Sequence, residues 1–141
     1  MSIGKRLRSI RKYRGLTQKQ LGELLGYNSS SCIRIAQYES GRRSPSPDAI
    51  KNFSRVLNVV PDALDIPSID GSTNLMHLLF ALEEYYDLRI ETSNDEVRLH
   101  FNNTDIQELL SDWMNLYGAF LNGEITEQEY KEWQYQYQGK K

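Results

Sequence analysis

The first half of the chain carries apolar residues at helical spacing. In residues 3–13, Ile3, Leu7 and Ile10 recur every three or four positions, and the positions between them are nearly all basic. This spacing places the three apolar side chains on one face of an α-helix. We predict that the helix ends at Gly15, because glycine readily adopts the left-handed conformation that closes a helix.

A second helix is predicted after Thr17. Residues 17–20 (TQKQ) fit a capping box, in which the Thr17 hydroxyl accepts from the Gln20 amide and the Gln20 side chain reaches back. The helix is expected to stop at Gly26, and its expected buried face consists of Leu21, Leu24 and Leu25. A helix this short depends on tertiary packing.

A third helix is predicted to begin within residues 28–31 (NSSS), to run to about Glu39 and to end at Gly41. Helical spacing gives it two different faces. The face expected in the core contains Cys32, Ile35, Tyr38 and Glu39, with Cys32 as a small core residue. The face expected to meet a ligand contains Ser30, Ile33, Arg34 and Gln37.

Two further helices complete the first half. Ser46 is the expected N-cap of the fourth helix and Pro47 its first residue. The buried stripe of that helix is expected to be Ala49, Ile50, Phe53, Val56 and Leu57. A short fifth helix should begin at Pro61, with Leu64 and Ile66 as its apolar residues. Residues 1–66 therefore predict a small five-helix bundle.

The second half predicts a separate α+β domain at residues 74–141, after a linker at 67–73. Its first helix is expected to be capped by Ser72 or Thr73 and to carry Leu75, Leu78, Leu79, Leu82, Tyr85 and Tyr86. Apolar and polar residues then alternate over 88–92 and 97–101 around a turn at 93–95, which predicts a β-hairpin. A hairpin is marginal by itself in water, so this one should pack against other elements.

Two helices are predicted after the hairpin. Residues 104–107 (TDIQ) fit a capping box, and residues 122–123 (NG) should end the helix that follows. We expect its apolar stripe to form a homodimer interface, with residues 75–86 as the second choice; the stripe is Ile106, Leu109, Leu110, Trp113, Leu116, Tyr117 and Phe120. A last helix should follow Thr126, with its stripe at Tyr130, Trp133 and Tyr137.

Charge divides the chain at the same place. Residues 1–66 carry 12 Lys/Arg and 5 Asp/Glu, a net charge of +7, whereas residues 67–141 have a net charge of -9. This asymmetry favours one half that faces a polyanion and one that does not, although two differently solvated surfaces are an alternative. There is no apolar run of membrane-spanning length and no signal-peptide core, so we expect a cytoplasmic protein that meets no membrane.

Catalytic and metal-binding patterns are not apparent. The two histidines, His77 and His100, show no metal-ligand spacing to each other or to Cys32, the single cysteine. We expect neither an enzyme nor a bound cofactor.

Several residues of the first half occur together in a familiar order. The pattern RxxRxxxGLTQxxLxxxLG over residues 8–26 is followed by QYESG at 37–41 and by a basic Ser/Pro loop. Over about residues 4–66 the chain resembles the phage-repressor/Cro (XRE) type of helix-turn-helix domain. The resemblance implies a lambda-repressor-like DNA-binding domain in a mainly α protein, with double-stranded DNA as its partner. Between Gly26 and Glu39 the chain is a few residues longer than is usual in the family.

A recognition helix around residues 30–39 would lie in the major groove of DNA. There Arg34 suits guanine, Gln37 suits adenine and Ile33 suits a thymine methyl group. Ser30 and Ser31 are further candidates for base contacts. Phosphate contacts are expected from Thr17, Gln18, Asn28, Ser29, Arg42 and Arg43, of which Gln18 matches a phosphate-binding position of the family. Weaker candidates are Arg6, Arg14, Lys19 and Lys51, and a solvated surface role is the alternative for each residue.

Glu39 falls on the inward face of this helix, where an unpaired carboxylate is costly. The family pattern suggests a partner at Arg11, seven residues before Gln18. We predict an Arg11–Glu39 ion pair that holds the first helix to the recognition helix.

The leading hypothesis is a dimeric repressor that reads a palindromic operator, because one small domain contacts only a few base pairs. One alternative is an antitoxin-like or anti-regulator protein, whose second domain binds a protein partner. Another is a second domain that senses a small molecule or peptide.

Overall fold

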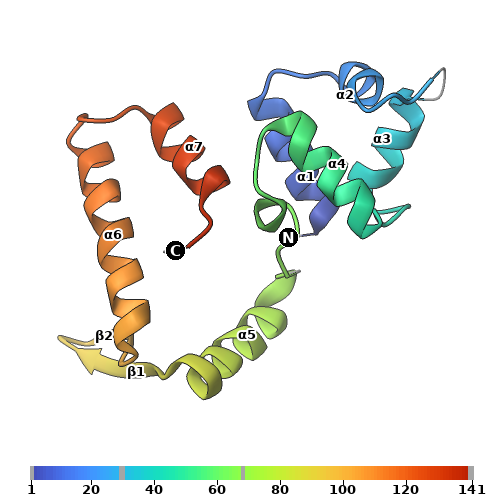
Figure 1. Cartoon of the computed structure of the whole chain (residues 1–141). Helices are drawn as coiled ribbons and strands as arrows, with labels where there is room; N and C mark the ends of the chain where they lie inside the picture. Colours follow the sequence, from blue (N-terminus) through green and yellow to red (C-terminus); the bar gives the residue numbers. More distant parts are fainter. Residues whose placement is uncertain (1, 29–30, 68, 140–141) are drawn as a thin grey trace. The chain divides into compact units, whose positions relative to one another are not determined.

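The computed structural model describes residues 2–28, 31–67 and 69–139. The chain divides into two compact units, Met1–Ile69 with Tyr135–Tyr137 and Asp70–Gln134 with Gln138–Lys141 (Figure 1). We call them the first and the second unit and describe each by itself. In the part of the chain that the structure describes, no helix is long and apolar enough to cross a lipid bilayer.

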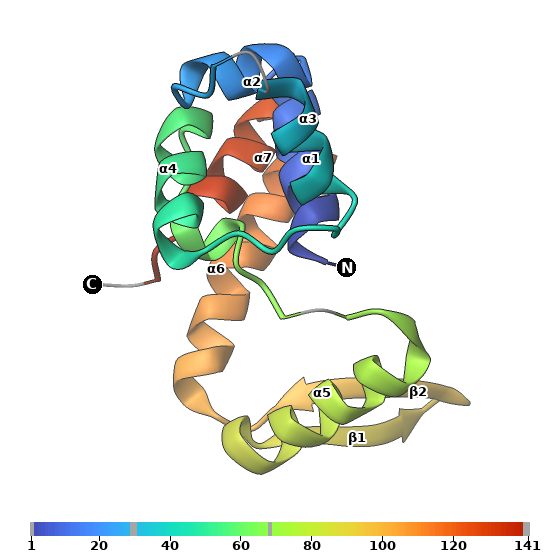
Figure 2. The ribbon, with the colours of Figure 1, turned by 90° about the vertical axis from the view of Figure 1, so that its right-hand side faces the viewer.

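The first unit is built from helices (Figure 2). It contains α1 (Ile3–Tyr13), α2 (Gln18–Leu24), α3 (Ser31–Glu39), α4 (Pro47–Leu57) and the 3-10 turn η1 (Pro61–Ala63). The predicted capping box is present, since the Gln20 amide donates to the Thr17 hydroxyl at 3.1 Å and the Thr17 amide donates to the Gln20 side chain at 2.8 Å. Ser46 also caps α4 as predicted, accepting from the Ala49 amide at 3.2 Å. The five predicted helices are therefore found, the fifth as a single 3-10 turn.

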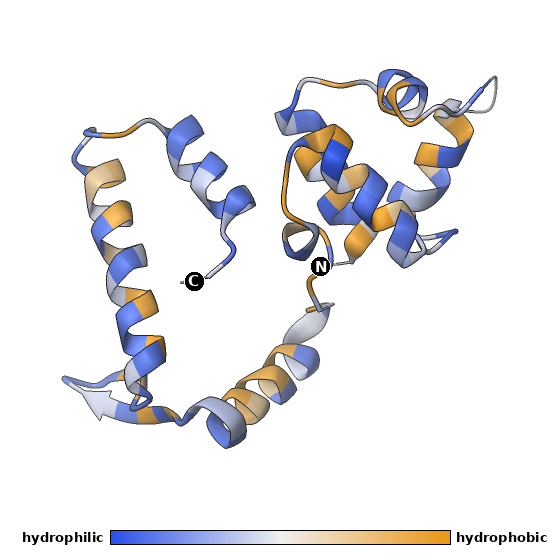
Figure 3. Cartoon of the chain, in the orientation of Figure 1, coloured by the Kyte–Doolittle hydropathy of each residue, from blue (hydrophilic) through white to orange (hydrophobic). Residues whose placement is uncertain are grey.

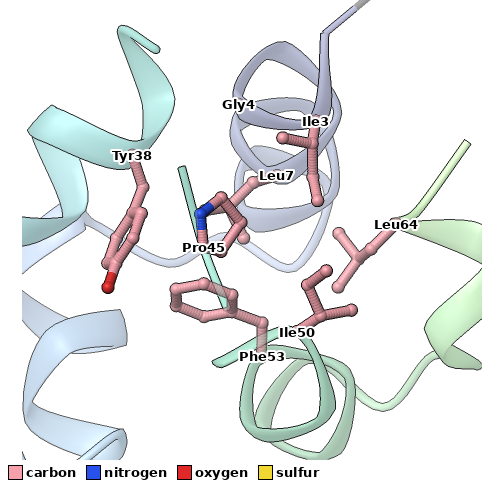
Figure 4. Close-up of a pocket in the computed structure, with 8 residues that line it drawn as sticks. All are labelled: Ile3, Gly4, Leu7, Tyr38, Pro45, Ile50, Phe53 and Leu64. Carbon is pink, nitrogen blue, oxygen red and sulfur yellow. The ribbon is translucent and has the colours of Figure 1, made fainter. Parts of the chain in front are cut away.

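The core of the first unit is formed by apolar side chains that the sequence predicted to be buried on several helices. Its largest fully buried side chains are Leu7, Ile10, Leu21, Ile35, Phe53, Leu57 and Leu64. Figure 4 shows where α1, α3 and α4 meet, with Leu7, Tyr38 and Phe53 among the side chains that face one another. No space for a water molecule remains between them. One predicted core residue is wrong, because Leu24 is 58% exposed.

Two helical glycines allow helices to approach closely. A Cβ atom at Gly4 of α1 would lie 2.2 Å from the Tyr38 carbonyl oxygen at the end of α3. A Cβ atom at Gly22 of α2 would lie 2.5 Å from the Ser31 Cβ atom at the start of α3. The start of α3 therefore packs directly on the backbone of α2 at Gly22, and its end packs on the backbone of α1 at Gly4. These two close contacts fix the position of α3.

The core of the first unit also includes residues from the end of the chain. Tyr135 is 5% exposed, and its ring centroid lies 5.3 Å from that of Tyr13. Its carbonyl oxygen accepts from the Val60 amide at 2.9 Å. The Gln136 side chain donates to the Asn58 carbonyl at 2.6 Å. The sequence had assigned the stripe of the last helix to Tyr130, Trp133 and Tyr137, so the most buried aromatic residue there was missed.

The second unit consists of helices and a two-stranded hairpin (Figure 1). It contains α5 (Gly71–Tyr86), β1 (Leu88–Ser93), β2 (Glu96–Phe101), α6 (Thr104–Leu121) and most of α7 (Glu127–Gln136). The strands pair antiparallel, from Leu88 opposite Phe101 to Ser93 opposite Glu96. Asn94 and Asp95 have φ angles of 52° and 63°, as a two-residue type I′ turn requires. The predicted hairpin is therefore present.

Two predicted helix caps in the second unit are wrong. Asp70, not Ser72 or Thr73, is the N-cap of α5, so the helix begins inside the predicted linker. Asn103, not Thr104, is the N-cap of α6, and its side chain accepts from the Ile106 amide at 3.0 Å. By contrast, Thr126 caps α7 as predicted, with its hydroxyl accepting from the Glu129 amide at 3.2 Å.

Apolar residues occur along α5 and α6 (Figure 3), and many of their side chains are exposed. Neither α5 nor α6 has a buried residue. The predicted α6 stripe is partly used inside the unit, because Trp113 donates to the Tyr130 hydroxyl at 2.6 Å and Phe120 stacks on the Tyr130 ring at 5.2 Å. Exposed apolar side chains remain on α5, on the hairpin and on α6, among them Phe80 at 52%, Ile90 at 71% and Met114 at 66%.

Candidate nucleic-acid interface

The segment from α2 to α3 forms a helix-turn-helix unit. Gly26 ends the α2 region with a φ of 76°, and the Tyr27 amide donates to the Gly22 carbonyl at 2.8 Å. The α3 helix begins at Ser31, whose amide donates to the Asn28 carbonyl at 3.0 Å. Its start therefore falls within residues 28–31, as predicted. Ser29 and Ser30, two predicted contact residues, lie outside the described residues.

A buried ion pair holds α3 to α1. The Arg11 Nε and Nη2 atoms donate to the two Glu39 carboxylate oxygens at 2.5 and 3.0 Å. Their side chains are only 8% and 3% exposed. Arg11 Nη1 also donates to the Leu16 carbonyl at 2.6 Å, which ties the same guanidinium to the turn before α2. The predicted Arg11–Glu39 pair is thus present, and it connects α1, α3 and the loop between α1 and α2.

Gln18 joins this pair from the first turn of α2. Its Nε2 atom donates to Glu39 Oε2 at 2.9 Å, and Cys32 Sγ lies 3.7 Å from its Oε1 atom. An amide nitrogen carries two N–H groups, so the bond to Glu39 uses one of them. One Gln18 N–H therefore braces α3, and the other is left for the phosphate contact that the sequence predicts.

The outer face of α3 differs in part from the predicted one. Ile33 is 64% exposed, and Arg34 and Gln37 are half-buried. Ser31, a predicted base-contact residue, is 5% exposed and packs against Gly22, so it lies on the inner face of α3. Cys32 is exposed and is not the core residue that was predicted. The outer face therefore carries Ile33 and Arg34 and, one turn later, Gln37.

Arg34 lies over an aromatic ring that the sequence did not indicate. Its guanidinium carbon is 4.6 Å from the centroid of the Tyr27 ring. Burial and the neighbouring Tyr38 raise the pKa of the Tyr27 phenol, while the Arg34 charge lowers it. A guanidinium that stacks on a ring keeps its N–H groups in its own plane for other acceptors. Tyr27 therefore holds Arg34 in position at the edge of α3.

The basic residues around α3 fall into two groups. Arg42 and Arg43 are exposed just beyond its C-terminus, with the Arg43 guanidinium 5.5 Å from the Tyr38 ring centroid. Two weaker phosphate candidates have structural partners instead. The Arg6 Nε atom donates to the Ala63 carbonyl at 2.9 Å, and Arg14 donates to the Leu57 and Asn58 carbonyls at 2.8 and 2.9 Å.

The remaining phosphate candidates lie at the surface of the unit. Thr17, Lys19, Asn28 and Lys51 are exposed, and Lys19 lies 3.8 Å from Glu23. In the described part of the chain, no group of three or more His, Cys, Asp or Glu side chains is arranged to hold a metal ion.

Comparison with known proteins matches the same half of the chain. A family model described as a helix-turn-helix domain matches residues 2–65. The HTH-type transcriptional regulator ImmR of Bacillus subtilis (strain 168) is 36% identical over 80 residues, which are 55% of this chain and 61% of that regulator. YazB of the same strain, named as an uncharacterized HTH-type transcriptional regulator, is 36% identical over 64 residues, which are 45% of this chain and 88% of YazB.

Two solved structures are also similar. The P22 c2 repressor protein, crystallised with synthetic operator 9T, has a TM-score of 0.41 at 30% identity, over 45% of this chain and 92% of that one. The transcriptional regulator BswR has a TM-score of 0.46 at 25% identity, over 82% of this chain and 93% of BswR. The 36% identity across most of YazB, together with the GLTQ and QYESG motifs in their places around α2 and α3, shows that the chain belongs to the XRE-type family of helix-turn-helix transcriptional regulators.

Proposed function

We propose that this protein is a transcriptional repressor that binds a palindromic operator as a homodimer and reads its sequence through α3. The observation that carries the proposal is the two-sided character of α3. Its inner side is fixed by the buried Arg11–Glu39 pair, and its outer side presents Ile33, Arg34 and Gln37. A helix fits the major groove and can read bases there only if its outer side chains are held in a fixed register.

The three outer side chains match different base edges. Arg34 can donate two hydrogen bonds to guanine, and Gln37 can exchange two with adenine. Ile33 offers an apolar contact to the methyl group of thymine. Exposed Arg42, Arg43, Asn28 and Thr17 and the second N–H of Gln18 would contact phosphates on either side. The protein would act where the chromosome is, in the cytoplasm.

The dimer would form through the second unit, which carries most of the exposed apolar surface. The α6 stripe is one part of this surface, with Leu110 37%, Trp113 47% and Tyr117 46% exposed. A net charge of -9 over residues 67–141 would keep this half away from DNA. A symmetric pair places two α3 helices on two half-sites one helical turn apart, which explains why the operator is expected to be palindromic.

The experiment is selection of binding sites by the full-length protein from random duplexes, followed by salt titration on the selected site. We expect a palindromic site and a binding constant that falls steeply with salt, since phosphate contacts release counterions. Arg34→Ala should weaken binding to the selected site, whereas Arg55→Ala, an equal charge change at an exposed position of α4, should not. An affinity that is flat across the salt range would exclude DNA as the ligand.

The sign of regulation needs a separate measurement. A reporter placed behind the selected site should be less active when the protein is present, because a bound dimer would block the polymerase. Higher reporter activity in the presence of the protein would contradict repression while leaving DNA binding intact.

A further inference from the structure

The hairpin of the second unit has two edges, and its hydrogen-bond pattern shows which backbone groups point outward. The Asn102 amide donates to the Asp87 carbonyl at 3.1 Å, and this pair continues the strand register. Hydrogen-bonded and non-hydrogen-bonded pairs alternate in an antiparallel ladder. Arg89 and Glu91 of β1 therefore bond to β2, while the backbone groups of Leu88, Ile90 and Thr92 point to the outer edge of β1.

The outer edge of β2 is partly occupied. By the same alternation of hydrogen-bonded pairs, the Phe101 carbonyl points outward from β2. The Gln107 side chain of α6 donates a hydrogen bond to this carbonyl at 2.7 Å. The outer edge of β1 has no neighbouring strand among the described residues, and Ile90 at its centre is 71% exposed. An open edge of this kind, with neither proline nor bulge, is ready to pair with another strand.

The charges along β1 are self-complementary when the strand meets a second β1 antiparallel. With Ile90 opposite Ile90 of the partner subunit, Arg89 lies opposite the partner's Glu91, and Glu91 lies opposite the partner's Arg89. These charged residues fall at non-hydrogen-bonded positions, where facing side chains are closest. The outward backbone groups of Leu88, Ile90 and Thr92 fall at the hydrogen-bonded positions, as a ladder requires.

The two nearest registers lack this match. A shift of two residues in either direction places Arg89 opposite Arg89, or Glu91 opposite Glu91. Pairing through β2 is also less favourable in its longer registers, because Arg98 would then face either itself or His100 and would have no opposite charge across the interface. Like charges directly opposite each other destabilise a sheet.

We propose that β1 pairs with β1 of a second copy about a two-fold axis at Ile90, which makes a four-stranded sheet in the order β2-β1-β1-β2. This inference rests on the proposed dimer and states where its two copies meet. A two-stranded hairpin is marginal alone, and four strands with one apolar face are not. The apolar face would continue across the axis, because Leu88, Ile90, Val97, Leu99 and Phe101 all lie on one side of the hairpin.

Within one chain the two charged residues already have neighbours. Arg89 forms an ion pair with Asp87 and lies opposite His100. Glu91 lies opposite Arg98, and its Oε2 atom is 3.9 Å from His100 Nδ1. A single charge reversal therefore changes the hairpin as well as the proposed interface, and the test must separate these two effects.

The test uses two full-length variants, Arg89→Glu and Glu91→Arg, alone and mixed in equal amounts. Alone, each puts like charges at both facing pairs, and sedimentation equilibrium should show a dimer at least about tenfold weaker than that of the wild type. Mixed, the two variants restore opposite charges at every pair, so native mass spectrometry should show a heterodimer of near wild-type affinity. Damage to the hairpin alone would not be reversed by mixing, and a mixture that stays monomeric overturns the proposal.

A backbone test supplies a matched control. Ile90→Pro removes an outward N–H of β1 and should abolish the dimer, whereas Leu99→Pro removes an outward N–H of β2 and should leave it intact. If Ile90→Pro remains dimeric and Leu110→Asp on α6 does not, the interface lies on α6 and the β1 pairing is wrong.

Binding to a duplex with one half-site separates this inference from the proposed function. Arg89→Glu should keep the wild-type affinity for the single half-site and lose affinity for the full palindrome. A wild-type chain that binds no DNA, yet follows the charge-exchange pattern, would refute the DNA-binding proposal and support the β1 pairing. If the protein binds DNA as a dimer and neither charge reversal weakens that dimer, the DNA-binding proposal is supported and the β1 pairing is refuted.

Discussion

At the scale of single residues, Glu39 ties α3 to α1 and α2, because its buried carboxylate accepts hydrogen bonds from both Arg11 and Gln18. Glu39→Gln keeps the shape of the side chain but leaves the buried Arg11 guanidinium without its counter-charge. We expect a loss of about 3 kcal/mol in the free energy of unfolding, measured by urea denaturation. Glu23→Gln is the control, since it breaks only the exposed Lys19–Glu23 pair at 3.8 Å and should change little.

Gln37 and Arg42 should have different effects on DNA binding. Gln37→Ala is expected to relax the preference at one base position and to cost about 1–3 kcal/mol on the preferred sequence. Arg42→Ala is expected to weaken binding to all sequences alike and to lower the salt slope by about one. Binding to a set of single-base operator variants at two salt concentrations measures both effects. A uniform loss for Gln37→Ala would show that Gln37 contacts the backbone and not a base.

At the scale of the elements, the contact of α2 with α3 depends on Gly22. A Cβ atom there would lie 2.5 Å from the Ser31 Cβ atom, so Gly22→Ala must push the two helices apart. We expect a lower melting temperature and weaker operator binding. Gly118→Ala in α6 is the control, because nothing lies within 4 Å of its added Cβ atom, and alanine should stabilise that helix by up to about 1 kcal/mol. Equal effects of the two substitutions would show that the α2–α3 contact tolerates the methyl group.

The helices of the first unit could be predicted because their signals are local. The Thr17 capping box, the Ser46 cap and the glycine at each helix end lie within a few residues of the structure they determine. The errors arose at contacts between helices. Leu24 was expected in the core from its spacing to Leu21. The buried face of α2 contains Leu21 and Gly22, however, and at 100° per residue Leu24 points away from that face.

The start of α3 shows the same limit. Cys32 was expected in the core from its helical spacing to Ile35, yet Ser31 is buried there and Cys32 is exposed. The position beside Gly22 admits only a small side chain, and this condition comes from a helix that is separate in sequence. The stacking of Arg34 on Tyr27 was missed for a similar reason, since the turn between α2 and α3 brings these residues together.

At the scale of the whole molecule, the chain leaves the first unit after Ile69 and returns to it at Tyr135. Sequence spacing could not reveal this return, because Tyr135 is one of several aromatic residues in α7 and its partners lie more than 70 residues away. The family model for helix-turn-helix domains matches residues 2–65 of the first unit, whereas the core of this unit also includes Tyr135. Tyr135 is therefore part of the core into which α1 packs.

This arrangement predicts that Tyr135→Ala destabilises the DNA-binding half. The substitution removes the ring that packs on Tyr13 at 5.3 Å and lies 5.4 Å from the Arg6 guanidinium carbon. We expect a loss of about 3 kcal/mol in unfolding free energy and faster amide exchange in α1 and α4. Tyr137→Ala is the control, because Tyr137 is 39% exposed and should matter less. Unchanged exchange in α1 and α4 of Tyr135→Ala would show that the helices of the first unit are stable without the end of the chain.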